Sequence, residues 1–207
     1  LKNLRKLNIN NEKQEVDLTR FSSLEDCSVD WNNKIKGLNT VNNIQHLKLW
    51  KFKPSSKDFT ALTGCMQVRT LKVTESNIES FEGIEALPAL DHFEGYYLPK
   101  LKQLNGLEIL AAQLTTLILE NSKKLTNYDA TLRQLTNLEK LILSDCAPLA
   151  TINFIQSLPK LSFFSFVGTN ILDGDISPAD TLRYAGFDNK RHYNRKSENM
   201  KNPLRKY

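Results

Sequence analysis

The side chains best suited to nucleophilic or metal chemistry do not assemble into a recognisable motif. They are three histidines and three cysteines: His46, His92, His192, Cys27, Cys65 and Cys146. The cysteines lack C-x-x-C spacing and stand far apart, so neither a zinc site nor a disulfide framework is predicted. The chain also lacks an H-E-x-x-H helix, a Walker loop and a G-x-S-x-G elbow. We therefore predict no enzymatic activity, no cofactor and no metal.

The elements that must position these residues follow a repeat. An apolar pair spaced one residue apart recurs nine times, most clearly in VRTLKV (68–73), LTTLIL (114–119) and LEKLIL (138–143). Successive copies are 20 to 24 residues apart. The first member of each pair is Leu7, Cys27, Leu47, Leu71, Phe93, Leu117, Leu141, Phe164 and Ala185.

Each apolar pair predicts a short strand, because alternation of period two places one face inward and the other toward solvent. One such strand cannot bury its apolar face alone, so the copies must stack in parallel around a shared core. Return segments such as Ile78, Phe81, Ile84 and Leu87 supply further apolar residues at spacings of three, which favour short helical or 3₁₀ turns. Nine strands would form a ladder about 40 Å long.

A repeat of this length with an L-x-x-L-x-L core resembles the leucine-rich repeat family. The resemblance implies an α/β solenoid of horseshoe shape, with a concave parallel sheet of about nine strands and short helical or 3₁₀ turns on the convex side. The repeat spacing and the run GFDNKRHY (186–193) are similar to those of bacterial members. The repeat domain is expected over residues 1–189. Residues 190–207 are expected to form a C-terminal cap, with Tyr193 over the end of the core, and a basic tail.

The positive charge of the chain is concentrated in this tail. Residues 190–207 hold seven basic residues and one glutamate, a net charge of +6, whereas the whole chain carries +5. The remaining 189 residues therefore carry −1. A body that binds nucleic acid should show a basic stripe along one face. We accordingly expect no nucleic acid partner for the repeat body, and leave open an electrostatic contact between the tail and an anionic polymer.

The functional content of the repeat lies in the residues between the inward leucines, which face solvent on the concave sheet. Early copies are polar there, whereas large apolar groups appear from Trp50 onward. Exposed apolar surface of this kind is typical of interaction sites, and Trp and Tyr are enriched at binding hot spots. The predicted apolar anchors are Trp50, Tyr96, Ile118 and Ile142, with Phe52 extending the Trp50 patch. The predicted polar surround is His46, Lys48, Lys72, His92, Glu94 and Glu120.

A structural explanation of the same residues stays open. The β propensity of Ile, Tyr, Phe and Trp also favours them at exposed strand positions. Phe163 and Tyr184 are better explained by covering within the chain than by a partner. His46 and His92 lie two strands apart, at about 10 Å, too far to share a zinc ion whose ligands lie about 2 Å away.

The sequence thus predicts a module that recognises a protein or peptide partner on its concave face. Two alternatives remain: the recognition domain of a secreted or surface virulence factor, similar in architecture to the internalins, and anionic-polymer binding through the tail. Three unpaired cysteines favour a cytoplasmic location, with a secreted or cell-surface location as the alternative. No apolar run is long enough to predict a membrane span.

Overall fold

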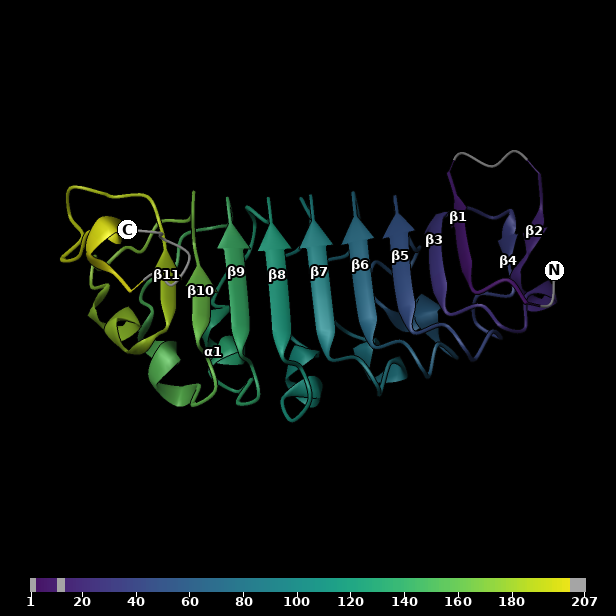
Figure 1. The fold of residues 1–207 in the computed structure, drawn as a ribbon. Coiled ribbons are helices and arrows are strands. Elements are labelled where there is room, and N and C mark those ends of the chain that lie inside the picture. The colour runs from purple at the N-terminus through teal and green to yellow at the C-terminus, as the bar shows by residue number, and fades with distance from the viewer. Residues whose placement is uncertain (1–2, 11–13, 202–207) are drawn as a thin grey trace.

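The fold is a curved solenoid whose concave side is one parallel sheet (Figure 1). A computed structural model describes residues 3–10 and 14–201. The sheet has nine strands in the order β1-β3-β5-β6-β7-β8-β9-β10-β11, which confirms the predicted fold class. Its strands are β1 (Lys6–Ile9), β3 (Asp26–Asp30), β5 (His46–Trp50), β6 (Thr70–Thr74), β7 (His92–Tyr96), β8 (Thr116–Glu120), β9 (Lys140–Ser144), β10 (Phe163–Ser165) and β11 (Tyr184–Gly186).

The pairing register follows the repeat of the sequence. Leu47 of β5, for example, pairs with Cys27 on one side and with Leu71 on the other. The inward residues between Cys27 and Phe166 are buried, whereas the inward residues of β1, Leu7 and Ile9, are only half-buried. Because a strand alternates its side chains between two faces, this register fixes which residues the concave surface presents.

The convex side changes structure along the solenoid. The first two repeats return through a two-stranded parallel sheet of β2 (Val16–Asp17) and β4 (Ile35–Lys36). The later repeats return through short helical turns, as the spacing of their apolar residues predicts. These are η2 (Thr60–Leu62), η3 (Ile84–Ala86), η4 (Leu107–Leu110), α1 (Asp129–Leu132), η5 (Asn153–Ser157) and η6 (Ser177–Thr181); η1 (Leu18–Arg20) and η7 (Ser197–Asn199) lie near the two ends.

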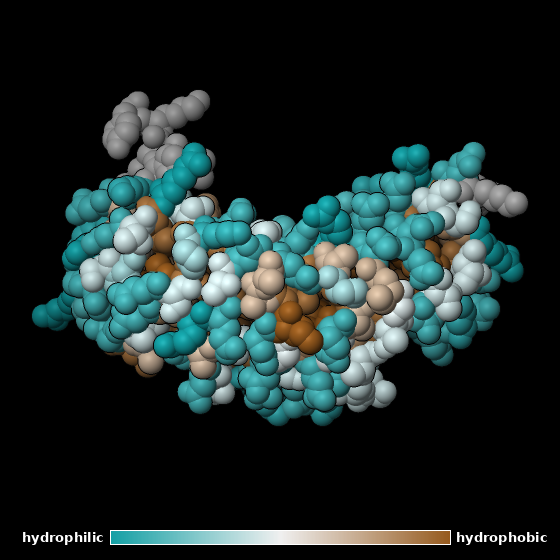
Figure 2. All heavy atoms as spheres, turned by 90° about the horizontal axis from the view of Figure 1, so that it is seen from below, coloured by the Kyte–Doolittle hydropathy of each residue, from teal (hydrophilic) through white to brown (hydrophobic). Residues whose placement is uncertain are grey.

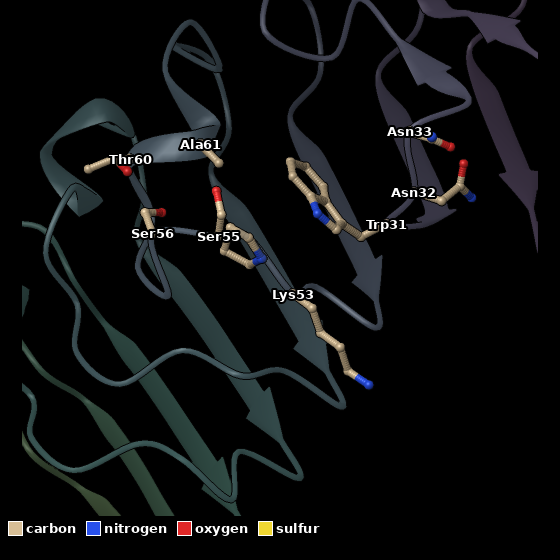
Figure 3. Close-up of a pocket in the computed structure, with 9 residues that line it drawn as sticks. Trp31, Asn32, Asn33, Lys53, Ser55, Ser56, Thr60 and Ala61 are labelled. Carbon is tan, nitrogen blue, oxygen red and sulfur yellow. The ribbon is translucent and has the colours of Figure 1, made fainter.

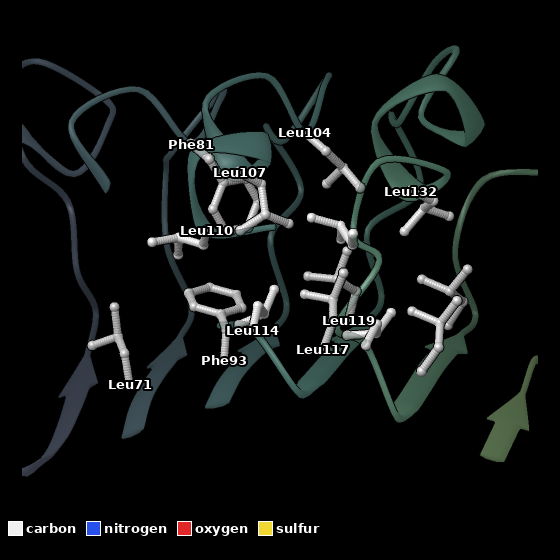
Figure 4. Close-up of a cluster of buried hydrophobic side chains, with 14 of the residues drawn as sticks. Leu71, Phe81, Phe93, Leu104, Leu107, Leu110, Leu114, Leu117, Leu119 and Leu132 are labelled. Atoms are coloured by element: carbon white, nitrogen blue, oxygen red, sulfur yellow. The ribbon is translucent and has the colours of Figure 1, made fainter. Parts of the chain in front are cut away.

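The core between sheet and convex turns has aromatic segments flanking a leucine segment. Phe52, Phe59, Phe81 and Phe93 form one continuous set of ring contacts, with centroids 4.9 to 5.8 Å apart. The middle repeats are filled mainly by leucines from strands and turns together (Figure 4). Aromatic rings return in the last repeats, at Phe154, Phe164, Phe166 and Phe187.

The chain leaves five successive strands through a left-handed residue. Lys51, Glu75, Tyr97, Asn121 and Asp145 all have φ between 50° and 57°. The first four donate their backbone N–H to a carbonyl of the next strand, as Tyr97 does to Glu120 at 3.0 Å, and Asp145 donates to Val167, beyond the end of β10. This turn directs the chain from the concave face to the convex side.

The C-terminal end of the solenoid is closed by the segment after β11. The ring of Tyr193 packs against Phe187, and its hydroxyl accepts the backbone N–H of Ile171 at 2.9 Å. His192 Nε2 lies 3.0 Å from the carbonyl of Ile171. The surface of the molecule is mostly hydrophilic, with an apolar area near the middle of the side seen in Figure 2. Within residues 3–10 and 14–201, no helix has the length and apolar character needed to cross a bilayer.

Candidate binding face on the concave sheet

The concave face presents three columns of side chains, and ten of the eleven predicted site residues occupy them on β5 to β9. In the middle column, Lys48, Lys72, Glu94, Ile118 and Ile142 are successive register partners. Neighbours in such a column lie about 4.8 Å apart at the backbone. The structure therefore brings the charged and the apolar candidates together at the boundary between Glu94 and Ile118.

Four of the predicted residues form one network around Glu94. His92 Nε2 lies 2.8 Å from Glu94 Oε1, and the Tyr96 hydroxyl donates to Oε2 at 3.1 Å. From the neighbouring strand, Lys72 Nζ lies 3.5 Å from Oε2 and 4.3 Å from the centre of the Tyr96 ring. Lys72 thus contacts both the carboxylate and the negative face of the ring. These contacts order four side chains in the unbound protein.

The network holds Glu94 in its charged form. The hydrogen bond from His92, the charge of Lys72 and the hydrogen bond from Tyr96 outweigh partial burial and lower the Glu94 pKa to about 2. Burial and the adjacent negative charge of Glu94 raise the Tyr96 pKa to about 12. At neutral pH the cluster therefore presents an anionic carboxylate that already has three donors.

The apolar candidates differ in how much surface they offer. Ile118 and Ile142 are register partners, but Ile118 is only 9% exposed. Trp50 is 39% exposed and lies two strands from Tyr96, with the buried Thr74 between them. A partner could therefore contact Trp50 directly. Little of the Ile118 side chain is accessible, so a partner would mainly contact the half-buried Ile142 beside it.

The prediction for Phe52 is wrong. Its side chain is fully buried and stacks with Phe59, so it belongs to the core and does not extend the Trp50 patch. Phe52 is buried because it follows β5, where the chain has already left the concave face and turned toward the core. Ser76 and Cys146 occupy the equivalent position in their repeats and are buried as well.

The remaining polar candidates flank this centre. His46 is exposed, Lys48 lies 3.9 Å from Asp26, and Glu120 accepts a hydrogen bond from Asn121 at 3.3 Å. His46 and His92 are separated by β6, as the repeat predicts. In the described part of the chain, no group of three or more His, Cys, Asp or Glu residues is placed to hold a metal ion.

Tyr97 is a surface residue that lies outside the three columns and outside the predicted site. It is 54% exposed, directly after Tyr96 at the end of β7, and it has the left-handed backbone conformation. This conformation is uncommon for a bulky residue, and it costs of order 1 kcal/mol or more. The sequence signal was available: an aromatic residue stands where the equivalent copies have Lys51, Glu75 and Asn121.

The three thiols are buried and take part in packing rather than chemistry. Burial raises the pKa of Cys27 to about 12, of Cys65 to about 11 and of Cys146 to about 12. A thiol so far from its thiolate form is a poor nucleophile at neutral pH. Cys146 instead donates a weak hydrogen bond to the carbonyl of Leu119 at 3.4 Å.

At the C-terminal end of the face, Phe163 and Tyr184 cover each other. Their rings are 4.1 Å apart and nearly parallel, and Lys140 Nζ lies 5.2 Å from the centre of the Phe163 ring. In the tail, Arg195 is held by Asp180 at 2.7 Å, while Arg191, Lys196 and Lys201 are exposed. Residues 202–207, with Arg205 and Lys206, lie outside the described part of the chain.

Comparison with protein-family models gives no match to this sequence, and comparison with curated proteins gives none either. The case for function therefore depends on the geometry of the concave face.

Proposed function

We propose that this protein is a leucine-rich repeat module that binds a protein or peptide partner through the concave face of β5 to β9. The observation that carries the proposal is the exposed Trp50, two strands from Tyr96 of the ordered polar network around Glu94, with the exposed Tyr97 directly after β7. Exposed aromatic groups of this kind are typical of hot spots. The four side chains around Glu94 lose less conformational entropy on binding because intramolecular contacts already order them.

The charges of this face favour a partner that supplies apolar groups rather than a strong opposite charge. Lys6 and Lys48 pair with Asp26, and Lys72 pairs with Glu94. Lys6 and Lys48 share one carboxylate, so these five groups carry a net charge of only +1, and long-range steering of a charged partner is weak. Recognition would then depend on burial of aromatic surface and on hydrogen bonds to the rim.

The test compares two double variants, each of which truncates two exposed side chains to alanine. Trp50→Ala with Tyr97→Ala removes one exposed aromatic group of the concave face and one in the turn beside it, but leaves the Glu94 network intact. Met66→Ala with Ile109→Ala is the matched control, because these apolar side chains, 50% and 61% exposed, lie outside the concave columns.

A partner captured from the source cells by the unaltered protein is purified and titrated calorimetrically against each variant. We expect the concave variant to bind at least about tenfold more weakly and the control to bind as the unaltered protein does. Equal affinity of all three proteins would place binding elsewhere. Circular dichroism melting of the concave variant must stay close to that of the unaltered protein, since a large loss would make these side chains structural.

A further inference from the structure

A second candidate site lies on the convex side, where the architecture of the solenoid changes. The spacing from Cys27 to Leu47 is 20 residues, whereas that from Leu47 to Leu71 is 24. The shorter repeat returns through β4, and the longer one returns through η2. β4 pairs back to β2, whereas η2 contacts η3, so each element packs away from the other.

This junction leaves two hollows that meet at Trp31. One has a volume of about 500 Å³ and is lined by the loop 53–56 and the start of η2. The other has a volume of about 350 Å³ and is lined by β4 and residues 37–39. Trp31, Asn32, Asn33 and Ala61 line both hollows. Figure 3 shows the Trp31 indole standing between the asparagines and the segment with Ser55 and Ala61.

The position of Trp31 is fixed by its neighbours. Its ring meets Phe52 edge-on with centroids 4.8 Å apart, so the core supports one end of the indole. The adjoining turn is closed by Asn32, whose side chain donates to the carbonyl of Asp30 at 3.1 Å and accepts the N–H of Lys34 at 2.8 Å. The half-buried indole is therefore a rigid platform.

The polar groups around this platform define the ligand chemistry. No lining residue is acidic; Lys53 lines the first hollow and Lys36 lines the second. Among the described residues, neither lysine makes an ion pair, whereas Lys51, Lys57, Lys72 and Lys102 all do. Amides of Asn33 and Asn39 and the hydroxyl of Ser55 supply further hydrogen-bonding groups.

We propose that the hollows beside Trp31 bind an acidic saccharide. One face of a sugar ring carries C–H groups that suit the indole, and its hydroxyls suit amides and serine. In an oligomer of uronic acids each sugar carries one carboxylate, and two of these would pair with Lys36 and Lys53. The combined volume is in the range of small-ligand sites, which is roughly 300 to 1,000 Å³.

The test is calorimetric titration with trigalacturonic acid, with maltotriose as the uncharged sugar and tricarballylate as the anion without a sugar. We expect saturable binding of trigalacturonic acid alone. Trp31→Ala should weaken it about tenfold or more. Because Trp31 also contacts Phe52, a second variant, Lys36→Ala with Lys53→Ala, tests the site without altering the core. Lys100→Ala with Lys123→Ala, a pair of exposed lysines elsewhere, is the control and should bind normally.

Each other outcome overturns the proposal. If tricarballylate bound as tightly as trigalacturonic acid, the site would recognise an anion without the sugar. If maltotriose bound as tightly, the lysines would have no role in recognition. Absence of saturation by about 10 mM probe would leave no site at all. Trp50→Ala with Tyr97→Ala should bind trigalacturonic acid normally, which keeps this result independent of the concave face.

Discussion

On the first strands of the concave sheet, oppositely charged side chains face each other across strand boundaries, whereas on the last strands apolar side chains do. Lys6 lies 3.0 Å from Asp26 and Lys72 lies 3.5 Å from Glu94. From β8 onward the contacts are between Ile118 and Ile142 and between the rings of Phe163 and Tyr184. Both halves have the same backbone register, so the sheet accepts either kind of cross-strand pair.

The difference matters for stability and for binding. Exposed ion pairs contribute about 0 to 1 kcal/mol and weaken with salt. Apolar side chains at the same positions contribute more when a neighbour covers them, and uncovered they leave surface for a partner. The stability of the polar half should therefore depend on pH and salt. The stability of the apolar half should depend on the size and shape of its side chains.

The largest expected effect comes from placing a charge in the apolar half. Ile118→Asp puts a carboxylate at a position only 9% exposed, beside Glu94. We expect a loss of about 3 kcal/mol in the free energy of unfolding, measured by urea denaturation. Asn8→Asp makes a carboxylate in the same column of the polar half, where Asn8 is exposed, and should change stability by less than about 0.5 kcal/mol. If Ile118→Asp and Asn8→Asp lost similar amounts of unfolding free energy, the two halves would not differ in their tolerance of a carboxylate.

A smaller loss is expected from Phe163→Ala. The substitution removes the stacked contact with Tyr184 and the contact of Lys140 with the ring. Because Phe163 is half-buried, the expected loss is about 2 kcal/mol in urea denaturation. Phe163→Leu keeps most of the apolar area and should recover about half of it. If Phe163→Leu were as stable as the unaltered protein, stacking would contribute nothing beyond area.

The polar half should account for a distinct pH dependence. The Glu94 pKa of about 2 lies below its ordinary value of 4.5, so its stabilising effect is complete above pH 4.5 and is lost as pH falls toward 2. Relative to Glu94→Gln, the unaltered protein should lose about 1 kcal/mol more over this range, after allowance for partial exposure. Chemical denaturation at several pH values measures the difference. Ile142→Ala, in the apolar half, should leave the pH profile parallel to that of the unaltered protein.

The smallest effect is expected at the first ion pair. Lys6→Gln removes the contact with Asp26, but the Lys6 side chain is 72% exposed. We expect a loss of about 0.5 kcal/mol at low salt, which disappears near 1 M salt. A loss that persists at high salt would contradict a surface electrostatic origin and would indicate packing of the lysine stem.

The repeat alone was sufficient to predict the nine strands of the concave sheet and their pairing, whereas it did not predict β2 and β4. The first inward residue of every copy, from Leu7 to Ala185, has the expected partner, because a side-chain period of two leaves one register that buries the leucines. The buried state of Phe52 was also within reach of the sequence. It stands three residues after Leu49, as Cys146 stands three residues after Leu143, and both are core positions.

The chain by itself therefore determined the direction in which each strand residue points. Only the tertiary structure decided how much of each side chain stays uncovered. Ile118 and Trp50 both lie in outward columns, yet one is 9% and the other 39% exposed. Coverage depends on the size and conformation of neighbours on adjacent strands, which local periodicity does not encode. The hollows beside Trp31 likewise arise where two return segments of unequal length meet, and that mismatch becomes a space only in three dimensions.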